Sequence, residues 1–385
     1  MRRLGNLLAF FSAIVGFFFG SFLTATISNF ETIEICNEKY SNKLRESSND
    51  LFIVVLILSA PNYEEKRDTM RNTWLKLSLT KSYYPEEYLN IPGYDDDGFL
   101  EVETIPSQMQ QFNYFLDWKI DHGASYIPSR DIKIKHFFAI GTKDMDVTLK
   151  NKLDNENSKY HDLLFIEDLV DSYSNLTKKL LKSIEILSNT QNFDYILKVD
   201  DDTYVKLDYL ANELVSYDRK LLRIANVEQD KLLPELYWGY FNGKANIKTK
   251  GIWKETHYNL CNHYIPYALG GGYVISRNIA LYIKNNGKYF NTYLSEDVSM
   301  GIWLAPLKNI YRKHDIRFDT AYIPRQYKDY HLVLHKRSPA QMIILYKNDE
   351  SLKDSNSIKG LNIMREYFYD WKKPPTNCCD QSSTV

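Results

Sequence analysis

Tyr195-Ile-Leu-Lys-Val-Asp200-Asp201-Asp202 joins an apolar run to three consecutive carboxylates. The run from Phe193 to Val199 has the character of a strand that is buried on both faces. Strands of this kind belong to parallel sheets that helices cover on both sides. In open α/β sheets, ligands bind at the carboxyl ends of the strands, and the three carboxylates lie at such an end. The stretch therefore predicts a buried central strand with a polar site at its end.

Further apolar runs and helical patterns lie on either side of this stretch. The predicted strands are Leu51–Leu58, Ile134–Ile140 and Leu163–Ile166, and the predicted helices span residues 64–77 and 172–188. Strands that alternate with helices indicate an α/β fold. We expect one catalytic domain over residues 51–376, followed by a short tail at residues 377–385.

The amino-terminal segment is strongly apolar, and it carries no charge from Leu4 to Phe30. A helix needs roughly 20 apolar residues to cross a bilayer. Arg2 and Arg3 precede the run, so the amino terminus is expected on the cytoplasmic side. The prediction is a cytoplasmic tail, an uncleaved signal anchor and a polar stem, at residues 1–6, 7–27 and 28–50 respectively. The alternative is a cleaved signal peptide, whose apolar region is usually only about 7–15 residues long.

Composition excludes several classes of protein. Lys and Arg number 48 and Asp and Glu number 49, so a nucleic-acid-binding protein with a general basic surface is not expected. Four cysteines in 385 residues cannot form a disulfide-dense scaffold, and their spacing gives no zinc motif. The sequence leaves the pairing of Cys36, Cys261, Cys378 and Cys379 open. Asn175-Leu176-Thr177 is a sequon for N-glycosylation at Asn175, which is consistent with a lumenal domain.

Residues 81–131 interrupt the alternation of strands and helices with ten acidic and three basic residues. Asp95-Asp96-Asp97-Gly98 follows Pro92 and Gly93 rather than an apolar strand. We interpret it as part of a solvated surface loop, because charged residues beside Gly and Pro mark loops. The segment is predicted to be an acidic insertion in the catalytic domain.

Asp200, Asp201 and Asp202 carry the strongest chemical signal. Carboxylates this close repel one another, which raises their pKa values and lowers stability. A divalent cation relieves the repulsion, and hard oxygen ligands suit Mg²⁺ or Mn²⁺. The spacing excludes an EF-hand, because Val205 and Ala211 stand where Gly and Glu are needed. An acidic turn at the end of a strand is the alternative interpretation.

A second group of carboxylates begins a predicted helix at Ser295-Glu296-Asp297. Ser295 suits the N-cap and the acids suit the first turn, so a structural role explains much of the pattern. In the functional interpretation, a carboxylate at this helix start acts as a general base toward a bound hydroxyl group.

Three further patterns admit two interpretations each. Gly270-Gly271-Gly272 precedes a short strand, where glycines either allow the backbone to approach a ligand closely or form a bulge. Arg67 and Arg71 share a helix face, and they are either solvated or placed to bind a diphosphate. His331 and His335 lie in an apolar run, where each is either a core or surface residue or a metal ligand.

At these motifs the chain resembles the β1,3-galactosyltransferase family of type II Golgi glycosyltransferases. The shared elements keep their order over most of residues 51–335, which makes the resemblance specific. They are Arg67–Trp74, Phe138–Gly141, Asp162–Leu164, Asp171–Thr177, Lys198–Asp202, Tyr267–Ser276 and Glu296–Gly301. The carboxyl-terminal part, from Tyr369 to Cys379, resembles the family members that act on the glycosaminoglycan linker of proteoglycans.

The resemblance implies an α/β fold of the GT-A class, which is a Rossmann-like mixed sheet flanked by helices, with an N-terminal transmembrane helix. It implies a membrane-anchored enzyme of the Golgi apparatus with a lumenal catalytic domain. The implied donor is UDP-galactose and the implied metal is Mn²⁺. The implied acceptor is the galactose of Galβ1,4Xyl on a serine of a proteoglycan core protein. The insertion has no counterpart in the family pattern.

The resemblance also implies roles for individual residues. Asp297 would be the catalytic base of an inverting reaction, and Asp202 and His335 would bind the metal. The residues near the donor nucleotide would be Arg67, Arg71, Lys198, Asp200, Asp201, Gly271, Gly272 and Glu296.

Two alternatives to this function stay open. The first is another enzyme of the same fold, either a β1,3-N-acetylglucosaminyltransferase or a β1,3-galactosyltransferase for glycoprotein or glycolipid glycans. The second is a lumenal glycan-binding protein without catalytic activity. The intact carboxylates at residues 200–202 and 296–297 favour an enzyme, because a binding protein does not need both groups.

Overall fold

The computed structural model describes residues 51–77, 81–82, 131–227, 233–325, 327–328, 331–353 and 368–380. The predicted cytoplasmic tail, signal anchor and stem lie outside the described residues, as does most of the acidic insertion. Among the helices of the described part, none is long and apolar enough to cross a membrane. The two ends of the insertion pair with each other, as the antiparallel strands β2 (Lys81–Ser82) and β3 (Asp131–Ile132).

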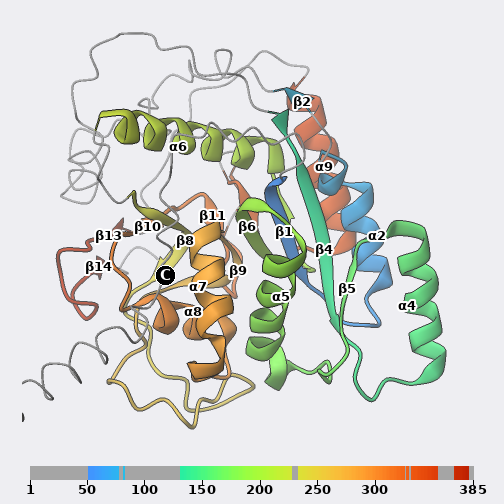
Figure 1. Ribbon diagram of the computed structural model, residues 1–385, viewed down its shortest axis with the longest axis horizontal. Helices are drawn as coiled ribbons and strands as arrows, with labels where there is room; N and C mark the ends of the chain where they lie inside the picture. Colours follow the sequence, from blue (N-terminus) through green and yellow to red (C-terminus); the bar gives the residue numbers. More distant parts are fainter. Residues whose placement is uncertain are drawn as a thin grey trace, which may run out of the picture. The chain divides into compact units, whose positions relative to one another are not determined.

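Seven strands form the central sheet in the order β10-β8-β9-β6-β1-β4-β5 (Figure 1). They are β1 (Leu51–Leu58), β4 (Ile134–Gly141), β5 (Leu163–Ile166), β6 (Phe193–Asp200), β8 (Glu235–Asn242), β9 (Tyr267–Ser276) and β10 (Ile310–His314). β9 runs antiparallel to both its neighbours, and the other six strands run parallel to one another. β1 and β6 lie side by side and are buried along almost their whole length, as expected of apolar strands in a covered sheet.

This architecture confirms the four predicted strands and the mixed α/β class, and it is consistent with a GT-A fold. The helices are α2 (Glu64–Asn72), α4 (Val147–Tyr160), α5 (Leu176–Thr190), α6 (Leu207–Val227), α7 (Arg277–Asn286), α8 (Glu296–Leu304) and α9 (Pro339–Lys353). The chain moves outward from β1 to β4 to β5 and then returns to β6. Because parallel crossovers are right-handed, α2 and α4 cover one face of the sheet and α5 covers the other (Figure 1).

The helices predicted over residues 64–77 and 172–188 are present, but their ends differ from the sequence pattern. The helix predicted over residues 64–77 ends early, because Thr73 leaves the helical region at φ −121° and ψ −115°. The 3₁₀ turn η1 (Trp74–Leu77) follows, and it places the Trp74 ring fully inside the core. The helix predicted over residues 172–188 begins with another 3₁₀ turn, η3 (Tyr173–Asn175), before α5 starts.

Short strands complete the described structure. β7 (Tyr204–Val205), β11 (Phe318–Asp319) and β12 (Val333–Leu334) form a three-stranded sheet in the order β11-β12-β7. Since β7 follows β6 after only three residues, this small sheet lies next to the carboxyl end of β6. It brings the segment after β12 close to the three carboxylates.

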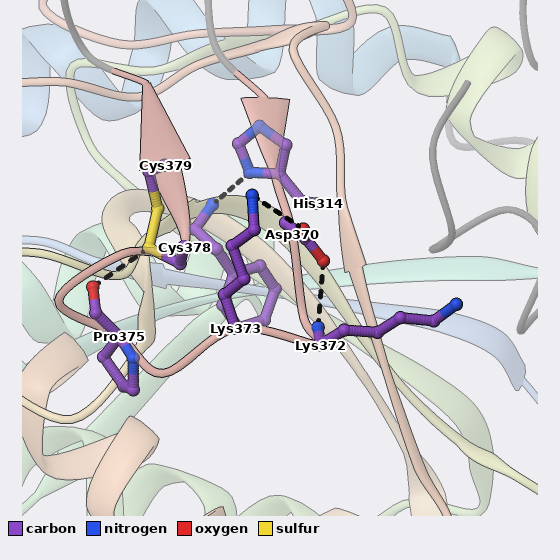
Figure 2. The surroundings of a disulfide bond; sticks show 8 residues. His314, Asp370, Lys372, Lys373, Pro375, Cys378 and Cys379 are labelled. Atoms are coloured by element: carbon purple, nitrogen blue, oxygen red, sulfur yellow. Dashed lines mark hydrogen bonds and ion pairs between the residues drawn. A yellow bond between two sulfur atoms is a disulfide. The ribbon is translucent and has the colours of Figure 1, made fainter. Parts of the chain in front are cut away.

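The structure shows the disulfide pairing of some of the cysteines that the sequence left open. Cys378 and Cys379 form a disulfide between adjacent residues (Figure 2). Cys379 begins β14 (Cys379–Asp380), which pairs antiparallel with β13 (Phe368–Tyr369). Cys261 is exposed and free, and Cys36 lies outside the described residues.

Candidate active site

Asp200, Asp202 and His335 converge at the carboxyl end of β6. Asp200 is the last residue of β6, and His335 directly follows β12. The His335 Nε2 atom lies 3.3 Å from Asp200 Oδ2 and 3.1 Å from Asp202 Oδ1. One potential ligand atom from each of the three side chains lies within 4.8 Å of the others. The predicted pair Asp202 and His335 is therefore brought together, with Asp200 as a third member.

The orientation of the His335 ring indicates that this cluster suits a cation. The Nδ1 atom of this ring lies 3.4 Å from the carbonyl oxygen of Ala321, which can only accept, so the proton of the neutral ring belongs on Nδ1. The lone pair on Nε2 then faces two carboxylates. Asp202 Oδ1 and His335 Nε2 are buried and face each other at 3.1 Å, and with the proton on Nδ1 neither atom donates to the other. An imidazole and two carboxylates, oriented in this way, fit a divalent metal ion.

The same charges act on the titration of His335. Burial alone would lower the pKa of His335, but the carboxylates of Asp200 and Asp202 outweigh it and raise the pKa to about 9. A cation, either a proton on Nε2 or a metal ion, is thus favoured at this position.

Asp201 has a different environment from its two neighbours. Its Oδ2 accepts a hydrogen bond from Ser59 Oγ at 2.9 Å, and its Oδ1 accepts one from Lys66 Nζ at 2.8 Å. Burial raises the pKa of Asp201, although Lys66 and Ser59 oppose the shift. Ser59 directly follows β1 and Lys66 lies in α2, so Asp201 connects β6 to these two elements.

Lys198 links the two groups of carboxylates. Its side chain is fully buried, and its Nζ donates to Asp200 Oδ1 at 2.9 Å, to the Gly270 carbonyl at 2.6 Å and to Glu296 Oε1. Burial would lower the pKa of Lys198, but the charges of Asp200 and Glu296 outweigh it and raise the pKa. The ammonium group is therefore a fixed positive charge between the ends of β6 and α8.

Asp297 is held at the start of α8 by backbone groups. Its Oδ2 accepts a hydrogen bond from the Gly270 N–H at 2.9 Å, and its Oδ1 accepts one from the Val298 N–H at 2.8 Å. Burial raises the pKa of Asp297, while the charge of Lys198 and the two N–H groups oppose the shift. A half-buried carboxylate in a fixed orientation with a raised pKa has the properties of a general base.

Glu296 is almost completely buried beside Asp297. It accepts hydrogen bonds from Lys198 and from the Tyr273 hydroxyl, the latter at 2.9 Å. Burial raises the pKa of Glu296 to about 7, against the opposing charge of Lys198. Ser295 occupies the predicted N-cap position, but its side chain makes no capping hydrogen bond.

The predicted glycines form a bulge in β9. Tyr273 pairs with Gly239 of β8, whereas the next pair joins Ala268 to Phe241, so β9 contains extra residues at its glycines. The bulge turns the Gly270 N–H and carbonyl toward Asp297 and Lys198.

Gly271 and Gly272 allow side chains of the protein itself to approach closely, whereas the predicted approach was to a ligand. A Cβ atom on Gly271 would lie 2.5 Å from His335 Cγ, and one on Gly272 would lie 2.8 Å from Val333 Cγ1. Only glycine leaves room for His335 at the first of these positions.

Arg67 and Arg71 both have protein carboxylates as partners. The Arg67 guanidinium is fully buried and binds Glu156 through two hydrogen bonds, of 2.7 and 2.6 Å. Arg71 binds Asp162 through two hydrogen bonds of 2.8 Å. These pairs attach α2 to α4 and to the start of β5. The sequence predicted only solvation or contact with a diphosphate for these arginines, and not this structural role.

The remaining candidates lie apart from the carboxylate cluster. His331 is fully buried, and its Nδ1 accepts a hydrogen bond from the Lys328 N–H at 3.3 Å. Asn175 is half-buried, and its Nδ2 donates to the Val170 carbonyl at 3.0 Å. Thr177 of the sequon is buried and donates to the Tyr293 carbonyl at 2.6 Å.

Several residues of the site were not predicted. Ser59 and Lys66 bind Asp201, and Lys336 Nζ donates to Asp202 Oδ2 at 2.9 Å. Ser59 could have been found from its place at the end of a parallel strand, and Lys336 from its place beside His335. Nothing in the sequence singled out Lys66, because lysines on the polar face of an amphipathic helix are common.

Comparison with known proteins gives the family. The galactosyltransferase family profile matches residues 120–315. Beta-1,3-galactosyltransferase 6 of Mus musculus is 32% identical over 335 residues, which cover 87% of this chain and 84% of that protein.

Other matches are more limited. UDP-GalNAc:beta-1,3-N-acetylgalactosaminyltransferase 2 of Homo sapiens is 36% identical over 155 residues, which are 40% of this chain and only 28% of that protein. Among solved structures, HddC from Yersinia pseudotuberculosis matches at a TM-score of 0.23 and 13% identity, over 69% of this chain and 91% of that one. Because the first relative is similar over most of both chains and the profile covers half of the sequence, this chain belongs to the galactosyltransferase family.

Proposed function

We propose that the protein is an inverting glycosyltransferase that transfers galactose from UDP-galactose to the 3-hydroxyl of the galactose in Galβ1,4Xyl-O-Ser. This acceptor is the start of the glycosaminoglycan linker of proteoglycans. The observation that carries the proposal is the placement of Asp297, a fixed carboxylate with a raised pKa, across Lys198 from the cluster of Asp200, Asp202 and His335. Family membership supports galactosyl transfer, and similarity to a protein named beta-1,3-galactosyltransferase 6 supports the linkage.

In the proposed reaction, the acceptor hydroxyl attacks the anomeric carbon of the donor. The new carbon–oxygen bond forms as the bond between that carbon and UDP breaks, and the hydroxyl proton passes to Asp297. Attack from the face opposite the leaving group converts an α-linked donor into a β-linked product. A single base of this kind contributes roughly 10²- to 10⁴-fold to the rate.

Asp200, Asp202 and His335 would hold Mn²⁺ in this proposal. The metal, when bound, supplies positive charge that stabilises the leaving diphosphate. Lys198 keeps Asp200 and Glu296 in place, and Glu296 in turn lies beside Asp297.

A second candidate donor is a UDP-N-acetylhexosamine. The similarity to UDP-GalNAc:beta-1,3-N-acetylgalactosaminyltransferase 2 favours this alternative, although it spans less than a third of that protein. Such an enzyme would use the same base and the same metal cluster with a larger donor sugar.

The test is transfer by the full-length chain to a synthetic Galβ1,4Xyl acceptor. UDP-galactose, UDP-N-acetylgalactosamine and UDP-N-acetylglucosamine are offered separately with Mn²⁺, and the products are identified by mass and by NMR of the new linkage. We expect a β1,3-linked product from UDP-galactose. Product only from the N-acetylated donors, or none on this acceptor, would reject the specific proposal.

We also propose that the enzyme is a single-pass type II protein of the Golgi membrane with its catalytic domain in the lumen. The proposal rests on the apolar run at residues 7–27 and on the sequon at Asn175. A glycan-dependent mobility shift of the expressed protein, absent in Asn175→Gln, is expected. An unmodified wild-type protein whose activity is accessible from the cytosol would contradict it.

A further inference from the structure

Three aromatic side chains from separate segments meet beside the proposed active site. Tyr173 lies in η3, Trp253 lies between β8 and β9, and Tyr322 lies in the loop after β11. We call these three residues the aromatic cluster. The Trp253 and Tyr322 rings meet edge to face with 4.8 Å between centroids, and the Trp253 side chain lies near Tyr173, whose pKa burial raises and Trp253 partly lowers.

The aromatic cluster is open to solvent. Tyr173 is 45% exposed, Tyr322 is 65% exposed and Trp253 is half-buried. Large rings that gather at the surface from distant parts of a chain are typical of binding sites. Packing of the core does not explain the position of these rings.

One side of the aromatic cluster borders the candidate metal site. Tyr322 follows Ala321, whose carbonyl oxygen lies 3.4 Å from His335 Nδ1. Lys336 Nζ lies 6.0 Å from the centre of the Tyr322 ring and donates to Asp202 Oδ2 at 2.9 Å. A single lysine side chain therefore spans the distance between this ring and the carboxylates.

The other side borders the start of α8, which carries Asp297. Glu255, two residues after Trp253, accepts a hydrogen bond from the Leu294 N–H at 2.8 Å, and Thr177, which follows η3, donates to the Tyr293 carbonyl at 2.6 Å. The segments that carry Trp253 and Tyr173 are therefore both attached to the residues directly before α8.

The chemistry of the rings suits a sugar. A pyranose presents carbon-bound hydrogens on its faces and hydroxyl groups around its edge. Each residue of the aromatic cluster likewise combines an apolar ring with a polar N–H or O–H at its edge. Because the metal cluster would hold the diphosphate and Asp297 must meet the attacking hydroxyl, rings on segments that contact the start of α8 are placed for the acceptor.

We propose that Tyr173, Trp253 and Tyr322 form an acceptor subsite that packs against a neutral pyranose and holds its hydroxyl group at Asp297. This assignment rests on the proposed function for the direction of transfer. It adds the residues that recognise the acceptor, none of which belongs to the carboxylate network.

The experiment separates acceptor binding from donor binding in the full-length protein. Trp253→Ala and Tyr322→Ala are compared with Tyr289→Ala, a control at another exposed tyrosine that is 74% exposed on η4 (Gly287–Tyr289). KM for Galβ1,4Xyl, kcat and the Kd of Mn²⁺–UDP are measured for each protein. We expect KM to rise about tenfold in Trp253→Ala, the order of magnitude of a lost stacking contact, with the Kd of UDP within twofold of wild type. Trp253→Phe should recover part of the loss, and Tyr289→Ala should behave as wild type.

Two results would overturn the subsite. The first is an unchanged KM in both alanine variants. The second is a parallel weakening of UDP-galactose binding, which would assign the rings to the donor.

A measurement without turnover keeps this test apart from the proposed function. Binding of the free disaccharide is followed by saturation-transfer NMR in the wild type and in Trp253→Ala. Binding that is lost in the variant supports the subsite even if the wild type transfers no galactose, an outcome that would reject only the proposed function. No binding of the disaccharide to the wild type would overturn the subsite.

Discussion

Lys198 shows how one residue organises the proposed active site. An ammonium group has three N–H donors, and here they reach Asp200, the Gly270 carbonyl and Glu296. A charge buried in this way is tolerated only when its hydrogen bonds are satisfied and its charge is compensated. Lys198 therefore couples the metal side of the site to the base side without itself facing solvent.

Asp297→Asn is the most direct test of the base. The amide keeps the size of the carboxylate but cannot accept the acceptor proton, so we expect kcat to fall roughly 10²- to 10⁴-fold. Mn²⁺-dependent binding of UDP-galactose should survive, because Asp297 lies outside the cluster of Asp200, Asp202 and His335. Turnover is followed by UDP release and binding by calorimetry. Near-normal turnover in this variant would remove Asp297 from the role of base.

His335→Ala tests the metal ligand. Loss of the imidazole should weaken Mn²⁺-dependent UDP binding by more than about 100-fold, because even indirect disturbance of a metal ligand costs 10- to 100-fold. His331→Gln is the matched control, since His331 is also buried but contacts the Lys328 backbone instead of the carboxylates. Calorimetric titration of UDP at fixed Mn²⁺ measures both. Unchanged binding in His335→Ala, or an equal loss in the control, would contradict the assignment.

At the scale of elements, the bulge in β9 positions the site. Gly271→Ala would place a Cβ atom 2.5 Å from His335 Cγ, so the imidazole must move away from Asp200 and Asp202. We expect Mn²⁺-dependent UDP affinity to fall roughly 10- to 100-fold while thermal unfolding stays cooperative.

Gly287→Ala provides the control for that substitution. Gly287 has a helical φ of −54°, and its nearest neighbours to an added Cβ are atoms at the end of the flexible Leu181 side chain. The Gly287→Ala variant should therefore bind UDP with the affinity of the wild type. If both alanine variants bind UDP equally well, the glycine does not control His335.

The elements that form the sheet were predictable because their signals are local. β1 and β6 are continuous apolar runs, and their burial follows directly from composition. For the glycines of β9, the sequence left a bulge and a ligand contact as alternatives. It could not decide between them, because a bulge is defined by the register of β9 with β8, which the sequence does not reveal. β12 contains only Val333 and Leu334, too short a strand to distinguish His331 from His335 by alternation.

Partners between distant elements were the main features that the sequence could not supply. The pattern placed Arg67 and Arg71 on one helix face but gave no sign of Glu156 or Asp162. Such pairs join residues about ninety positions apart, and the fold alone brings them together. The aromatic cluster was missed for the same reason, since Tyr173, Trp253 and Tyr322 share no local motif.

At the scale of the whole molecule, His331 makes stability depend on pH. Burial, with the charges of Arg325 and Arg337, lowers the pKa of folded His331 from 6.5 to about 3. Above pH 6.5 the ring is neutral in both the folded and the unfolded chain. As the pH falls toward 3, only the unfolded chain takes up the proton, so the free energy of unfolding decreases by up to about 1.4 kcal/mol per pH unit.

Urea unfolding between pH 7 and pH 4 measures this dependence. His331→Gln should show a shallower decrease than the wild type, because it cannot be protonated. Equal slopes in the two proteins would show that other groups cause the acid sensitivity.

The ends of the acidic insertion give a prediction for the molecule as a whole. Ser82 pairs with Asp131, directly before β4 begins, so the insertion leaves and re-enters at the amino end of that strand. The proposed site lies at the opposite, carboxyl end of the parallel strands. Replacing residues 83–130 by an Asn-Gly turn should therefore preserve folding and transfer to the free disaccharide. Loss of cooperative unfolding, or a loss of kcat above tenfold, would contradict this expectation.

The pairing of β2 with β3 fixes the two ends of the insertion next to each other. A segment whose two ends are paired in this way can change in length or sequence without altering the path of the chain on either side. Changes in the insertion are therefore separated from the proposed site at the far edge of the sheet. The connection between β2 and β3 is therefore a suitable position for inserting an affinity tag or a reporter domain.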